Sequence, residues 1–153
     1  FPISTDMSFF HTPIRGKMQY TVEEVFPEFS RDVGSIVYLG ATITFVMLQF
    51  AYHLGFDEIY LIGLDHNYGE LPKKFKPHKT KITSENFHLF QNHFDKNYFK
   101  IGDTVGASPN VKLQEMGYAE AKKIIEASGR KVYNASVDSK LDVFDKIEYN
   151  SLF

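Results

Sequence analysis

The sequence predicts an α/β domain in which a parallel sheet is flanked by helices. Three observations lead to this prediction: an apolar run of helix length at 43–54, an apolar run of strand length at 58–64, and a second helix-to-strand unit at 111–135. Strands that alternate with helices are typical of parallel sheets with right-handed crossovers. The chain has 153 residues, of which 43% are hydrophobic, so it is long enough to bury a core of its own.

The N-terminal residues show no sustained periodicity. Pro2, Pro13 and Pro27 interrupt them together with Gly16, so we treat residues 1–33 as an irregular lead-in and 34–153 as the domain. Residues 35–39 then form a short β-rich run, which predicts a strand that ends at Gly40.

The central helix and strand have the strongest signals. Residues 45–54 leave almost no polar face, which predicts a buried helix. Thr42 or Thr44 can cap its start, and Gly55 stands where a C-terminal glycine is favoured. Residues 58–64 are continuously apolar, which is typical of a central parallel strand covered on both faces.

The second half repeats the pattern after a longer excursion. Residues 67–82 predict a lysine-rich loop, and the phenylalanines of 83–100 have nearly helical spacing. A helix is expected over 111–128, a strand over 131–135, and a tail at 141–153 that folds back onto the sheet. Two or three strands make a thin sheet, whereas a doubly wound domain has two halves, so we expect an N-terminal half upstream of Phe1.

The composition narrows the possible chemistry. The absence of cysteine excludes a disulfide framework, a thiolate zinc site and a cysteine nucleophile within this sequence. A net charge of −2 argues against a nucleic-acid partner. Because no apolar run approaches the roughly 20 residues of a membrane helix, no transmembrane segment is predicted. The absence of cysteine fits the expected cytoplasmic location.

Ligands of open parallel sheets bind beyond the carboxyl ends of the strands. The helix start is one candidate there: Gly40, Thr42 and Thr44 could offer backbone N–H groups and hydroxyls to a phosphate, or could form an ordinary helix cap. The sequence contains neither a Walker A motif nor a GxGxxG motif.

A polar cluster follows the predicted central strand. Asp65, His66, Asn67 and Tyr68 could bind a metal or a sugar hydroxyl or supply a base, or Asp65 could bond the N–H groups of a turn. His66 has no second histidine at ligand spacing, so no metal site is predicted. Later in the chain His93 and Tyr98 combine a candidate acid or base with ring faces, although packing explains their spacing equally well.

Residues 40–68, GATITFVMLQFAYHLGFDEIYLIGLDHNY, resemble the 6-hydroxymethylpterin pyrophosphokinase-like family, which includes motility accessory factors implicated in flagellin glycosylation. The shared features are a Gly-x-Thr-x-Thr helix start, a Gln-x-Ala on the helix and an Ile-Tyr-Leu-Ile-Gly-x-Asp-His strand end. HFDKNYF, Ser108-Pro109-Asn110 and the terminal NASVDSKLDVFDKIEYNSLF also match, so the resemblance extends from about residue 26 to 153.

The chain is more distantly similar to bacterial sialyltransferases that use CMP-sialic acid. In that resemblance residues 42–44 replace a Thr-Ser-Gly helix start, and Tyr68 is displaced by one residue from a tyrosine that contacts the donor phosphate. Tyr98 fits a second tyrosine, but Ile101 stands where those enzymes have their histidine base. Either His66 or His93 substitutes for it, or the protein uses another acceptor chemistry.

Together the resemblances imply the C-terminal half of a Rossmann-like glycosyltransferase domain. Its partners would be a nucleotide-sugar donor and a glycan or protein acceptor in bacterial surface polysaccharide or glycoprotein biosynthesis, in the cytoplasm or at the inner membrane face. No cofactor is expected, and a homo-oligomer is left open. The expected catalytic residues are His66, His93 and Asp65, and the expected donor-binding residues are Gly40, Thr42, Thr44, Asn67, Tyr68 and Tyr98.

Two alternatives stay open. The first is pyrophosphoryl transfer to a pterin, which would require Mg²⁺ near Asp65. The second is a non-catalytic module that binds a nucleotide or a sugar.

Overall fold

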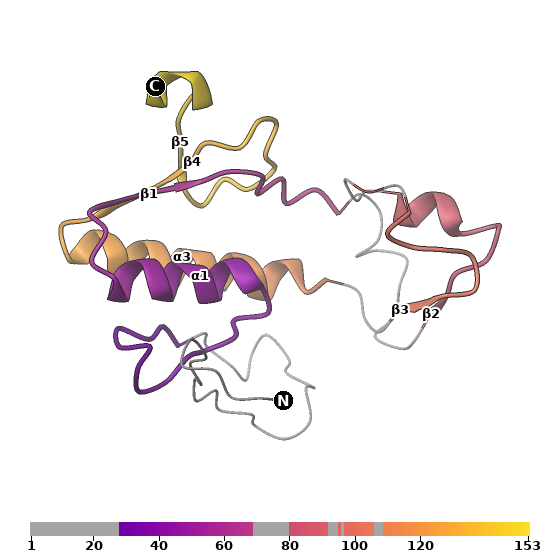
Figure 1. Ribbon diagram of the computed structural model, residues 1–153, viewed down its shortest axis with the longest axis horizontal. Coiled ribbons are helices and arrows are strands. Elements are labelled where there is room, and N and C mark those ends of the chain that lie inside the picture. Colours follow the sequence, from indigo (N-terminus) through magenta and orange to yellow (C-terminus); the bar gives the residue numbers. More distant parts are fainter. Residues whose placement is uncertain (1–27, 69–79, 92–94, 96, 106–108) are drawn as a thin grey trace, which may run out of the picture.

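The computed structural model describes residues 28–68, 80–91, 95, 97–105 and 109–153. The elements in chain order are α1 (Ile43–His53), β1 (Glu58–Leu61), β2 (Thr80–Lys81), the 3₁₀ helix η1 (Phe87–Phe90), β3 (Thr104–Val105), α3 (Val111–Ala127), β4 (Lys131–Asn134), β5 (Asp145–Lys146) and the 3₁₀ helix η2 (Tyr149–Leu152). The α/β class is confirmed: β1, β4 and β5 form a parallel sheet in that order, and α1 and α3 lie side by side on one face of it (Figure 1).

The register of the sheet separates its two faces. β1 pairs with β4 from Glu58↔Lys131 to Leu61↔Asn134. Ile59 and Leu61 pack toward the helices, with the core of the domain. Side chains alternate along a strand, so Tyr60 and Tyr133 lie on the opposite face, where their rings stack with centroids 5.3 Å apart.

The core lies between the two helices and the sheet. Its fully or nearly fully buried members are Phe29, Phe45, Leu48, Tyr118, Ala121, Ile125, Val132, Leu141 and Phe144. Leu141 and Phe144 confirm that the C-terminal tail folds back onto the domain. Gly117 lets the helices approach each other, because a Cβ there would stand 3.2 Å from Cδ2 of Phe45.

Both helix starts follow the sequence signals. Thr42 caps α1, since its hydroxyl oxygen accepts a hydrogen bond from the N–H of Thr44 at 3.4 Å. Asn110 caps α3 in the same way, through the N–H of Leu113 at 3.1 Å. None of the helices within the described ranges is long and apolar enough to cross a membrane.

The prediction that α1 is buried all round is wrong. Ile43, Met47 and Leu54 are 71%, 62% and 66% exposed, because α3 and the sheet cover one side of the helix. The strand after it is shorter than expected and lies at an edge: β1 ends at Leu61 and, in the described part of the chain, pairs with β4 alone. Ile62 is consequently exposed.

Residues 35–39 are not a strand, because a side chain takes the place of a neighbouring strand. Gln49 is fully buried, and its Oε1 accepts hydrogen bonds from the N–H groups of Ser30 and Tyr38 at 3.0 and 3.1 Å. Its Nε2 donates to the carbonyl oxygens of Tyr38 and Phe45 at 2.7 and 3.1 Å. One amide therefore satisfies the backbone of an irregular segment.

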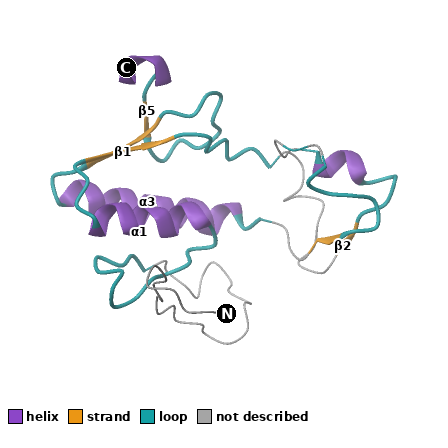
Figure 2. Ribbon diagram, in the orientation of Figure 1, coloured by secondary structure: helices purple, strands orange, loops and turns teal. Residues whose placement is uncertain are grey.

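The excursion between the two halves forms a small unit of its own. β2 and β3 pair antiparallel, and Ile82 and Phe90, the last residue of η1, form a small buried cluster. The phenylalanines of 83–100 have nearly helical spacing, but the described part of this segment contains only the short 3₁₀ helix η1. Figure 2 shows this unit set apart from the layer of α1, α3 and the sheet.

Candidate functional site

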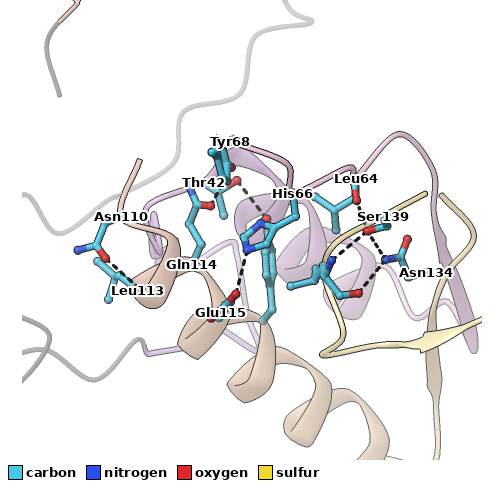
Figure 3. Close-up of polar contacts among 12 residues, drawn as sticks. Thr42, Leu64, His66, Tyr68, Asn110, Leu113, Gln114, Glu115, Asn134 and Ser139 are labelled. Carbon is cyan, nitrogen blue, oxygen red and sulfur yellow. Dashed lines mark hydrogen bonds and ion pairs between the residues drawn. The ribbon is translucent and has the colours of Figure 1, made fainter. Parts of the chain in front are cut away.

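The candidate site lies at the carboxyl end of β1, where residues 64–68 meet the loop after β4 (Figure 3). The N–H of Leu64 donates to the hydroxyl oxygen of Ser136 at 2.8 Å, and the hydroxyl of Ser139 donates to the carbonyl of Leu64 at 2.6 Å. The N–H of Lys140 donates to the carbonyl of Asp65 at 2.8 Å. These bonds fix the backbone that carries the polar cluster after the strand.

His66 is the buried member of that cluster. Its side chain is 2% exposed, and its Nε2 lies 3.2 Å from Oε1 of Glu115 on α3, a residue whose side chain is 46% exposed. The backbone of His66 is left-handed, with φ of 51°, a conformation that is uncommon outside glycine. The neighbouring Asp65, by contrast, is exposed to solvent.

The second ring nitrogen of His66 has a different environment. Its Nδ1 is buried and has no hydrogen-bond partner among the residues that the structure describes. Leaving a buried polar atom unpaired costs on the order of 1–3 kcal/mol, so such atoms are rare in folded proteins and call for a specific explanation.

Two tyrosines flank the imidazole and connect it to α1. The rings of Tyr68 and Tyr118 lie edge to face with it, at centroid distances of 5.4 and 6.0 Å. The Tyr118 hydroxyl donates to Oγ1 of Thr42, the cap of α1, at 3.4 Å. The cap of one helix, a tyrosine of the other and the histidine after β1 thus lie in contact.

Gln114, on the first turn of α3, connects the two loops of the site. Its Oε1 accepts from the Tyr68 hydroxyl at 2.8 Å, and its Nε2 donates to the carbonyl of Ala41 at 3.3 Å. Burial raises the pKa of Tyr68, and the hydrogen bond to Gln114 opposes this shift in part. Tyr68 is therefore a neutral hydroxyl at physiological pH.

The structure brings some of the expected residues together. Thr42, His66 and Tyr68 lie in one network through Tyr118 and Gln114.

Other expected residues lie at the margin of the network that joins Thr42, His66 and Tyr68. Asp65 and Asn67 are exposed on the same loop. The N–H of Thr44 is occupied by the Thr42 cap.

Gly40 has a packing role in this structure. Its φ is 54°, and a Cβ at this position would overlap the ring of Phe45. The glycine is required by the close approach of the loop to a buried aromatic ring, whatever else its N–H contacts.

The remaining expected residues are Tyr98 and His93. Tyr98 is exposed in the β2–β3 unit, with its ring edge to face against Phe99 at 4.8 Å. His93 lies outside the described residues.

Sequence reasoning missed the contribution of α3. Gln114, Glu115 and Tyr118 supply most of the partners of the expected residues. A signal was present: Gln114 and Tyr118 share a helix face at i and i+4, just after the cap residue Asn110.

Within the described ranges, no group of three or more acidic or histidine side chains is arranged to hold a metal ion. Comparison of the chain with protein-family models, with curated proteins and with solved structures gives no match.

Proposed function

We propose that this chain is the C-terminal half of a Rossmann-like glycosyltransferase domain that moves a sugar from a nucleotide-sugar donor to an acceptor hydroxyl. One observation supports this proposal above the others: a buried imidazole beyond the end of a parallel strand, with Nε2 beside a carboxylate and Nδ1 unpaired among the described residues. The acceptor is a glycan or protein of the bacterial surface, modified in the cytoplasm or at the inner membrane face, as the sequence resemblance implies.

His66 acts as the general base in this proposal. The acceptor hydroxyl passes its proton to His66 as its oxygen bonds to the anomeric carbon, and the bond from that carbon to the donor phosphate breaks. The nucleotide leaves with the electron pair of that bond. Histidine suits this task because its ordinary titration range lies near physiological pH.

The start of α1 would stabilise the leaving phosphate, and Tyr68 would do so by turning its hydroxyl hydrogen from Gln114 to a phosphate oxygen. The Thr42 oxygen accepts two hydrogen bonds, from Tyr118 and from the N–H of Thr44, so its own hydroxyl hydrogen is available to donate. The N-terminal end of a helix also carries a partial positive charge that favours anions. Asp65 is exposed next to His66 and is suited to accept hydrogen bonds from sugar hydroxyls.

A panel of CMP-, CDP-, UDP- and GDP-sugars tests the proposal with the full-length protein, with and without Mg²⁺. Calorimetry reports donor binding, and released nucleotide reports transfer or hydrolysis. Exchanging His66 for alanine should lower the rate by roughly 10²–10⁴-fold while donor affinity stays close to wild type. The exposed His53, which pairs with Asp32 at 3.5 Å, provides the matched control.

The His93→Ala variant tests the other expected base. If His66→Ala retains wild-type turnover and His93→Ala does not, His66 is not the base. If none of the nucleotide sugars binds or reacts, the glycosyltransferase proposal itself is refuted. Activity that depends strictly on Mg²⁺ and on a pterin substrate would favour pyrophosphoryl transfer instead.

A further inference from the structure

We infer that Glu115 is a positioning residue that keeps the proton of His66 on Nε2 and leaves Nδ1 as a bare acceptor for the hydroxyl of the acceptor substrate. This inference rests on the proposed function, in which His66 is the base. Glu115 is 49 residues away from His66 in the sequence, and the two meet through the packing of α3 against the loop after β1.

The contact between the two side chains selects the tautomer. An ionised carboxylate has only acceptor oxygens, so Nε2 of His66, at 3.2 Å from Oε1 of Glu115, must be the donor. A hydrogen bond to an ionised carboxylate is stronger than one between neutral groups. The neutral imidazole carries one proton, which this bond places on Nε2.

The opposite tautomer is disfavoured by the contact with Glu115. A proton on Nδ1 would be a buried donor without an acceptor among the described residues. The lone pair of Nε2 would then face the Glu115 oxygen. Nδ1 lacks a described partner in either tautomer, so the contact at Nε2 decides between them and favours the tautomer with a bare Nδ1.

The surroundings keep the ring in this orientation. Tyr68 and Tyr118 lie edge to face with the imidazole, at 5.4 and 6.0 Å. Tyr68 is in turn anchored by Gln114, the residue before Glu115 on α3. Two consecutive side chains of one helix turn thus fix the histidine and one of its aromatic neighbours.

A bare Nδ1 also determines what kind of group it can meet. It accepts a hydrogen bond, so its partner must be a donor such as a hydroxyl, and a phosphate oxygen without a proton is excluded as a partner. Within the proposed reaction, His66 therefore belongs to the acceptor side of the site. The donor phosphate belongs to the side of Thr42, whose hydroxyl accepts hydrogen bonds from Thr44 and Tyr118 and donates to none of the described residues.

Nitrogen-15 spectra of the histidine-labelled full-length protein test the tautomer directly, because protonated and bare ring nitrogens have well-separated chemical shifts. The His66→Gln variant identifies the His66 signals by their loss. We expect Nε2 to carry the proton and Nδ1 to be bare in the unmodified protein at neutral pH. A protonated Nδ1 in that spectrum would overturn the inference without any variant of Glu115.

Variants of Glu115 test its positioning role. Glu115→Ala should introduce a population with a protonated Nδ1 and lower the transfer rate by roughly 10–100-fold, by analogy with the loss caused by removing carboxylates that orient metal-bound histidines. Glu115→Gln keeps an acceptor oxygen, so it should retain more of the tautomer with a bare Nδ1 and more of the transfer rate than Glu115→Ala does. Glu126→Ala is the control, because Glu126 lies on the same helix and pairs with Lys122 at 3.9 Å. A ring spectrum of Glu115→Ala identical to that of the unmodified protein would refute the role.

The proposal that His66 is the base and the proposal that Glu115 positions it can be refuted independently. A bare Nδ1 that depends on Glu115, together with full transfer activity in His66→Ala, supports the tautomer and refutes His66 as the base. Loss of activity in His66→Ala with a protonated Nδ1 in the unmodified protein keeps the histidine in the reaction and refutes the role of Glu115.

Discussion

Replacing Gly40 with alanine separates the two interpretations of the loop before α1. The sequence suggests a phosphate-binding role for this glycine, whereas the structure gives it a packing role against the fully buried Phe45. Gly55 is the matched control: it also has a positive φ, of 83°, but a Cβ there would have no atom within 4 Å.

The structure sets the size of the expected effect. An alanine in the left-handed region costs about 1–2 kcal/mol, and both variants bear that cost. Gly40→Ala must also fit its methyl group against the Phe45 ring, and overpacking of this kind costs about 1–3 kcal/mol. We expect the free energy of unfolding to fall by roughly 2–5 kcal/mol for Gly40→Ala and by about 1–2 kcal/mol for Gly55→Ala.

Urea unfolding of both single variants measures the difference. A double-mutant cycle with Phe45→Leu isolates the contact, because the smaller side chain should relieve part of the overlap. Equal costs for Gly40→Ala and Gly55→Ala would refute the packing argument. A stable Gly40→Ala protein that has lost nucleotide-sugar binding would instead show that the glycine serves the ligand.

Three further changes test other parts of the structure. Gln49→Leu should lower the free energy of unfolding by about 2–4 kcal/mol in urea unfolding, because it leaves several buried backbone groups unpaired; a cost below about half a kcal/mol would contradict this. Leu61→Ala should cost about 2 kcal/mol in the same assay, the low end for a leucine, because Leu61 is only half-buried. The hydrogen bond and charge of Lys122 lower the pKa of Asp145 below 3.8. The pair therefore stabilises the fold at pH values above the unfolded pKa of Asp145, and this stabilisation is lost as the pH falls through the lowered folded pKa. Asp145→Asn should therefore weaken the acid-side loss of stability, measured by urea midpoints at neutral pH and about pH 3; an unchanged pH dependence would speak against the pair.

The parts of the fold that depend on neighbouring residues were predictable from the sequence. Thr42, one of the two expected caps, caps α1, because a cap needs a side chain and an N–H group only two or three residues apart. The alternation of helices and strands indicates the parallel sheet for a similar reason: the right-handed crossover follows from the twist of strand and helix.

Burial was harder to predict, because hydrophobicity shows what a segment could bury and not what covers it. Ile43 and Met47 belong to an apolar helix, yet they are exposed because α3 and the sheet pack against its other side. The run at 35–39 has the composition of a strand, but Gln49 bonds its backbone in place of a neighbouring strand.

In the candidate site, too, some features follow from the sequence and others depend on packing between distant segments. The sequence by itself determined that Asp65, His66 and Tyr68 follow a strand, and hence that they lie at the carboxyl end of the sheet. Only the tertiary structure decided that His66 is buried with Nε2 beside Glu115 and Nδ1 unpaired in the described part of the chain, while Asp65 faces solvent. The physical reason is that these environments depend on how α3 packs against the loop after β1, which brings together side chains that are far apart in the chain.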